Sequence, residues 1–131
     1  MDVKTNYETY KDCYLKVDKY QANDSLAIEI WNDTDGPIAR LTVCLPNERK
    51  PKENEAYIDE NNCPWAMDFI EKYSLGVNTE MFGLSGYCMY PKVAFDMDIV
   101  YQYTKETQEL CDEYQNLDAP YFWMTGDPMD V

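Results

Sequence analysis

The chain has 131 residues, 45% of them hydrophobic, so it is long enough for one folded domain and too apolar to be disordered. Its 25 acidic and 11 basic residues give a net charge of −14, which argues against direct binding to nucleic acid or anionic membranes and favours basic partners. It has no histidine, the commonest general base and metal ligand. We expect a cytoplasmic protein, because no apolar run is long enough to cross a membrane and the N-terminus has no pattern of a secretory signal.

The first part of the chain has the pattern of an antiparallel β-meander. Three segments alternate apolar and polar side chains with the period of half-buried strands: residues 13–20, 26–31 and 38–45. Asn23-Asp24 and Asp33-Thr34-Asp35-Gly36 are turn signals between them, and Gly36 accepts a positive φ. A short fourth strand is expected at residues 55–59.

The middle of the chain predicts a helix from Cys63 to Tyr73. Pro64 suits an early helical position, an asparagine or the cysteine lies near the cap, and Leu75-Gly76 ends the element. Residues 77–91 contain several glycine, proline and aromatic residues, which predicts an ordered aromatic loop leading into a strand around 92–95.

The last part of the chain turns to helical spacing from Asp96, with Ile99, Tyr103, Leu110 and Tyr114 close to one stripe. Residues 96–103 are also compatible with a continued strand, so the start of this helix stays open. Together the elements predict an α+β fold, an antiparallel sheet of four to five strands with two helices. Residues 1–131 form a single domain, with the acidic C-terminal helix and aromatic tail at about 96–131.

Acidic residues are concentrated in the second part of the chain. Residues 1–52 hold nine acids and eight bases, whereas residues 53–131 hold sixteen acids and three lysines. Carboxylates recur on one face of the C-terminal helix, which is either a solvated face or a surface that imitates nucleic-acid phosphate. The residues expected to contact a partner are Asp96, Asp98, Glu106, Glu109, Asp112, Glu113, Tyr121 and Trp123.

Two kinds of enzyme are weighed against this binding hypothesis. Cys63 lies at a predicted helix start, which favours a thiolate, although a buried inert thiol is the simpler interpretation. Asp59, Glu60, Asp96 and Asp98 offer hard oxygen ligands for a small metal-dependent hydrolase. A third alternative is an accessory structural protein whose acidity serves solubility. The leading hypothesis remains a non-enzymatic protein that needs no catalytic residue, metal or cofactor.

The run from Glu55 to Ile70, with Gly83–Pro91 and Phe95–Asp98, resembles an uncharacterised family, a domain of unknown function carried by phages and mobile elements of gut Firmicutes. The resemblance covers about residues 13–100, so the acidic helix and tail are expected outside it. It implies a bacterial cytoplasm and an accessory gene. Small acidic proteins of such elements include anti-CRISPR and antirestriction inhibitors that mimic DNA, which suggests a basic nucleic-acid-binding partner such as a CRISPR nuclease.

Overall fold

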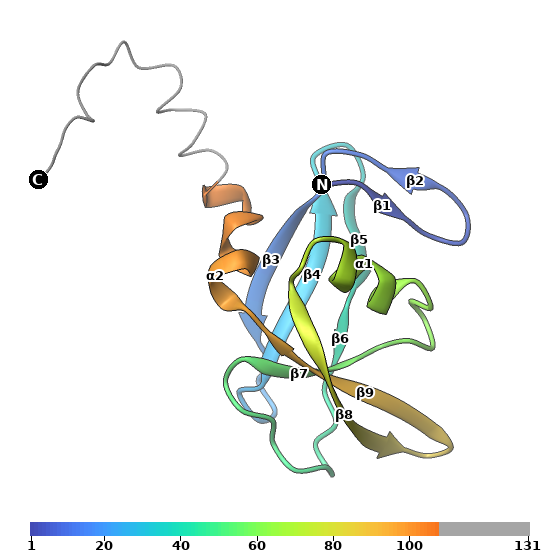
Figure 1. Ribbon diagram of the computed structural model, residues 1–131, viewed down its shortest axis with the longest axis vertical. Helices are drawn as coiled ribbons and strands as arrows, with labels where there is room; N and C mark the ends of the chain where they lie inside the picture. The colour runs from blue at the N-terminus through green and yellow to red at the C-terminus, as the bar shows by residue number, and fades with distance from the viewer. Residues whose placement is uncertain (108–131) are drawn as a thin grey trace, which may run out of the picture.

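The computed structural model describes residues 1–107, which fold into three antiparallel sheets and short helices (Figure 1). A two-stranded sheet pairs β1 (Val3–Lys4) with β2 (Thr9–Tyr10). A three-stranded sheet has the order β3 (Tyr14–Lys19), β4 (Leu26–Asn32) and β5 (Gly36–Arg40). The α+β class is therefore confirmed, but the prediction of one sheet with four to five strands is wrong.

A four-stranded sheet makes up the rest of the β-structure, in the order β6-β7-β9-β8. Its strands are β6 (Thr42–Val43), β7 (Glu55–Ile58), β8 (Gly76–Ser85) and β9 (Cys88–Phe95). The helices are α1 (Ala66–Lys72) and α2 (Met97–Gln102), and the chain is helical again over 105–107. The N-terminal hairpin β1–β2 was not predicted, because two-residue strands carry no periodic pattern.

The predicted strand 38–45 is divided at Leu41, and this division separates the two larger sheets. The N–H of Leu41 donates to the carbonyl of Ile28 at 2.9 Å, and its carbonyl accepts from the N–H of Asp59 at 3.0 Å. The backbone of Leu41 is thus hydrogen-bonded on both sides and connects the two larger sheets. Apolar side chains from both sheets and both helices form one core, which includes Leu15, Ile28, Ile30, Leu41, Ile58, Phe69, Ile70, Val93, Phe95 and Val100.

Residues 76–95 form a long β-hairpin, so the predicted aromatic loop at 77–91 is wrong. The pairing runs from Gly76 opposite Phe95 to Ser85 opposite Cys88, with a register shift between Asn78 and Phe82. That irregularity interrupts the alternation of β8, and with the glycines it gave the segment the pattern of a loop. Figure 1 shows the end of the hairpin extending away from the N-terminus.

Helix α1 confirms the predicted helix, but it begins later than Cys63. Its N-cap is Trp65, whose side chain makes no capping hydrogen bond, so the predicted asparagine or cysteine cap is wrong. The helix is held by its buried face, where Phe69 makes edge-to-face ring contacts with Trp65 and Tyr73 at 6.1 and 5.3 Å between ring centroids. Helix α2 begins after Asp96, as one of the two open interpretations predicted.

Candidate functional site

Asp96 is the cap of α2, so its carboxylate already has backbone partners. Its Oδ1 accepts hydrogen bonds from the N–H groups of Asp98 and Ile99 at 3.1 and 3.3 Å. A carboxylate at this position also interacts favourably with the positive end of the helix. Asp98 lies exposed in the first turn of the same helix. Asp96 therefore contributes charge to the surface, while one of its two carboxylate oxygens is engaged in capping the helix.

A break at Tyr103 and Thr104 separates Asp98 from Glu106. The carbonyl of Tyr103 accepts from the N–H of Leu15 at 2.8 Å, and Thr104 forms a β-bridge with the same residue. This pairing with β3 ends α2. The prediction that one helix face continues from Asp96 and Asp98 to Glu106 is therefore wrong. Glu106 is exposed in the helical turn that follows. The other predicted contact residues, Glu109, Asp112, Glu113, Tyr121 and Trp123, lie outside the described residues.

All three lysines that follow residue 52 make contacts within the fold. Lys92 is buried beside Glu55, with 3.9 Å between Nζ and the carboxylate. Lys105 forms a 2.8 Å salt bridge with Asp33, and its Nζ lies 5.4 Å from the centroid of the Tyr14 ring. Lys72 lies over the Tyr73 ring at 5.3 Å. These cations are therefore partly neutralised or shielded by their own chain.

Unlike these lysines, most of the described carboxylates of the same region are exposed and form no ion pair with another described residue. Seven of those between residues 53 and 107 are exposed, and none of the seven forms a salt bridge within residues 1–107: Glu53, Asp68, Glu71, Glu80, Asp96, Asp98 and Glu106. No lysine or arginine within residues 1–107 therefore offsets their charge by direct pairing. The described part of the second region thus presents an excess of negative charge at its surface.

Two of these carboxylates, Asp68 and Glu71, line an open groove between α1 and the base of the β8–β9 hairpin. The groove has a volume of about 850 Å³, Asp96 lies on its border, and no lysine or arginine lines it. Sequence reasoning missed this groove. The available signal was the spacing of Asp68 and Glu71, three residues apart on a helix whose buried face carries Phe69 and Ile70. The sequence pattern did not indicate that the β8–β9 hairpin forms the opposite wall of this groove.

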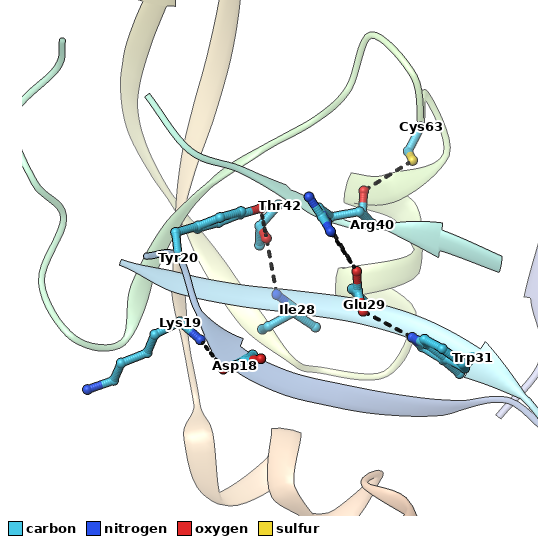
Figure 2. Close-up of polar contacts among 9 residues, drawn as sticks. All are labelled: Asp18, Lys19, Tyr20, Ile28, Glu29, Trp31, Arg40, Thr42 and Cys63. Atoms are coloured by element: carbon cyan, nitrogen blue, oxygen red, sulfur yellow. Dashed lines mark hydrogen bonds and ion pairs between the residues drawn. The ribbon is translucent and has the colours of Figure 1, made fainter. Parts of the chain in front are cut away.

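Charged and aromatic side chains on the outer face of β3, β4 and β5 have partners in the fold (Figure 2). Glu29 accepts from Trp31 Nε1 at 3.1 Å and from the Arg40 guanidinium at 2.9 Å. Burial alone would raise the pKa of Glu29, but the hydrogen bonds from Trp31 and Arg40 outweigh it and lower that pKa. Lys16 Nζ lies 3.5 Å from the centroid of the Trp31 ring. This cluster stabilises the sheet.

Cys63 has the environment of an inert thiol. It is buried, its Sγ lies 3.7 Å from the carbonyl oxygen of Arg40 (Figure 2), and it precedes the first residue of α1 by three positions. Burial, and to a lesser degree the charge of Asp59, raises the pKa of the thiol to about 11. A helix start that favours the thiolate is therefore absent at Cys63.

The carboxylates considered for a metal site are placed at opposite ends of the four-stranded sheet. Strands β7 and β9 are antiparallel, with Glu55 opposite Ala94. Asp59 and Glu60 follow the end of β7, whereas Asp96 and Asp98 follow the end of β9, so the pairing carries the two groups apart. Within residues 1–107, no three cysteine, aspartate or glutamate side chains are grouped as metal ligands.

Residues 14–117 match the model of a family described as a domain of unknown function (DUF4313). The match extends beyond the expected limit near residue 100, so Glu106, Glu109, Asp112 and Glu113 lie inside the family region, and only Tyr121 and Trp123 lie beyond it. No curated protein and no solved structure matches the chain. None of the helices over residues 1–107 has the length and apolarity needed to cross a membrane.

Proposed function

We propose that this chain, which belongs to the DUF4313 family, is a non-enzymatic binding protein whose acidic surface engages a basic, nucleic-acid-binding protein. One observation carries the proposal. After residue 52, Lys72, Lys92 and Lys105 contact partners within the fold, while seven exposed carboxylates of the same region form no salt bridge within residues 1–107. A surface of this kind presents a net negative field to a partner.

The chemistry of the partner follows from the sign of that field. Nucleic acid and anionic membranes are repelled, whereas a protein groove lined by lysine and arginine is attracted. Grooves of that kind bind phosphate backbones, so a surface of carboxylates competes with nucleic acid for them. The proposed partner is therefore a nucleic-acid enzyme of a host defence system, such as a CRISPR or restriction nuclease, and the protein is an inhibitor carried by a phage or mobile element.

The region proposed for the contact is the C-terminal part of the matched family region, and Asp98 and Glu106 are among its described residues. Glu109, Asp112 and Glu113 add three carboxylates within the next seven residues. Asp96 adds charge, but its hydrogen bonds to α2 make it unsuitable for a test by substitution with alanine. Glu106 and the three following carboxylates are better probes, because changing them leaves the cap of α2 intact.

The test compares two variants that each lower the net charge from −14 to −10. The first changes Glu106→Gln, Glu109→Gln, Asp112→Asn and Glu113→Gln. The matched control changes four exposed carboxylates of the first 52 residues, Glu8→Gln, Asp12→Asn, Asp18→Asn and Asp24→Asn. Asparagine suits position 24, where φ is +59°, because it tolerates that conformation better than most residues.

Each protein is immobilised and exposed to a nuclease-treated lysate of the organism that encodes the gene, at low and at high salt. We expect the wild type and the control variant to recover the same nucleic-acid-binding protein at low salt, and to lose it at high salt. The first variant should recover much less. Equal recovery by both variants would place the contact elsewhere, and recovery of no basic protein would favour an accessory role in which acidity serves solubility.

A further inference from the structure

The end of the β8–β9 hairpin is an uncharged surface on a strongly acidic protein. Residues 81–91 contain no charged side chain, although 27% of the whole chain is charged. Six of the eight large hydrophobic residues exposed within residues 1–107 belong to this hairpin, each at least half exposed: Val77, Met81, Phe82, Leu84, Tyr87 and Met89. Exposed apolar residues that are scattered need no explanation, whereas a concentration of this kind marks an interaction surface.

Strand pairing places three of these side chains on one face. Phe82 pairs with Pro91 and Leu84 with Met89, and alternation along a strand then puts Phe82, Leu84 and Met89 on the same side. The opposite side is covered, because a Cβ added at Gly83 would lie 2.6 Å from Leu45 Cδ1 and 2.7 Å from the Tyr57 ring. We call Phe82, Leu84 and Met89 the hairpin face.

The hairpin face continues the side of β9 on which Val93 and Phe95 enter the core, since positions 89, 91, 93 and 95 alternate to one side. The groove lined by Asp68 and Glu71 opens beside the base of the same hairpin and includes Val77. The basic loop residues Arg49 and Lys50 belong to the segment that covers the opposite side, where the Tyr57 hydroxyl donates to the Arg49 carbonyl at 3.1 Å.

The free edge of β8 is partly blocked against the addition of another strand. The N–H of Leu84 donates to the Glu48 carboxylate at 3.0 Å, and the N–H groups of Glu80 and Met81 donate to the side chains of Asn78 and Thr79. An edge on which several donors are already occupied is a poor template for strand pairing. A partner therefore packs its side chains against the hairpin face rather than extending the sheet.

We infer that the hairpin face docks a basic protein that presents an apolar surface bordered by lysine or arginine. The inference rests on the proposed function and adds a second, apolar contact to it. Charge complementarity selects this occupant, because a second copy would bring another −14 to the interface, whereas a basic partner is attracted to the acidic body. Burial of the hairpin face then supplies affinity that does not depend on salt.

The test uses the full-length protein and two synthetic peptides with the same number of lysines. One peptide carries leucine at helical spacing (i, i+3, i+4, i+7) with lysine at the other positions, so that its helix has an apolar and a basic face, and the other spaces its lysines with glycine and serine. We expect the wild type to bind the leucine–lysine peptide more than about tenfold more tightly, because burying one large apolar side chain is sufficient for that difference. Fluorescence anisotropy gives both dissociation constants.

The decisive variant is Phe82→Ser with Leu84→Ser and Met89→Ser, which should abolish the preference and leave binding of the spaced peptide unchanged. Its matched control is Tyr7→Ser with Tyr101→Ser, which removes the two large exposed hydrophobics that lie outside the hairpin within residues 1–107 and should keep the preference. If the triple variant does not fold, the single substitution Leu84→Ser replaces it, because that side chain belongs to the hairpin face and is 56% exposed. It should weaken binding of the leucine–lysine peptide alone.

Other results overturn the inference in distinguishable ways. If the triple variant keeps the preference while both peptides bind in a salt-dependent manner, the hairpin has no role and the proposed function stands. If neither peptide binds the wild type, both proposals fail. If light scattering shows that the wild type is a dimer and the triple variant is a monomer, the hairpin face is assigned to a second copy of the chain. If only the double variant Tyr121→Ser with Trp123→Ser prefers the leucine–lysine peptide, the hairpin face is assigned to the chain's own C-terminal segment.

Discussion

The N–H of Leu84 in β8 donates a 3.0 Å hydrogen bond to the carboxylate of Glu48, which lies 36 residues earlier in the chain. Strand β8 is at the edge of its sheet, in the order β6-β7-β9-β8. An exposed edge with apolar side chains is a template for pairing with another chain, and a side-chain acceptor that occupies an edge N–H blocks that pairing. Glu48 therefore protects the hairpin from association through its backbone.

We predict that Glu48→Ala makes the protein self-associate, because it frees the Leu84 N–H beside exposed apolar side chains. Multi-angle light scattering at high salt, where repulsion between acidic copies is screened, measures the change. Glu48→Gln is the matched control, since it loses the same charge but keeps an oxygen that accepts the hydrogen bond. Equal association of the two variants would show that charge, and not the hydrogen bond, keeps the copies apart.

Thr42 joins the two larger sheets through its hydroxyl. The Oγ1 atom accepts from the buried N–H of Ile28 at 3.1 Å and lies 2.9 Å from the Tyr20 hydroxyl (Figure 2). Thr42→Val keeps the shape but leaves the Ile28 N–H without an acceptor, which should lower the free energy of unfolding by about 1–3 kcal/mol. Urea denaturation measures the loss. Thr42→Ser retains the hydroxyl, so a Ser variant as unstable as the Val variant would contradict this explanation.

Glu29 should make stability fall at acidic pH. Burial opposes its charge, but hydrogen bonds from Trp31 and Arg40 outweigh burial and lower the folded-state pKa of Glu29 below its ordinary value of 4.5. A lowered carboxyl pKa stabilises the fold above the unfolded pKa, and this contribution disappears as pH falls through the folded pKa. Because Arg40 is exposed, the contribution should be below about 1 kcal/mol.

Urea denaturation of the wild type and Glu29→Gln over a pH series isolates this contribution. The glutamine variant cannot titrate at this position, so the difference in unfolding free energy should be present at neutral pH and vanish at the acidic end of the series. A difference that is constant across the series would mean that Glu29 acts through packing alone.

Cys63 should react slowly with iodoacetamide in the folded protein. Burial raises the pKa of its thiol to about 11, so almost no thiolate exists at neutral pH, whereas Cys88 is only half-buried. Peptide mass spectrometry after timed alkylation resolves the two sites. In urea the two cysteines should react at similar rates. Faster labelling of Cys63 than of Cys88 in the folded state would revive the hypothesis of a reactive thiol.

The local pattern of the chain was sufficient for some of its regular elements. Alternation predicted β3 and β4, the turn residues placed Gly36 at a positive φ of 76°, and helical spacing predicted α1 and the start of α2. The family was also recognisable from the sequence, although the matched region reaches residue 117 rather than about 100. These features depend on neighbouring residues, so a single chain contains them.

Other features depend on contacts between distant residues and only the tertiary structure decided them. Leu41 divides one predicted strand because Ile28 and Asp59 pair with its backbone, and Tyr103 ends α2 because its carbonyl pairs with Leu15. The sequence determined that this protein is acidic and where its acids lie along the chain. The fold decided which lysines neutralise their neighbours and which carboxylates remain exposed. It also decided that the uncharged end of a hairpin is exposed on the same acidic protein, because each of these features depends on three-dimensional packing.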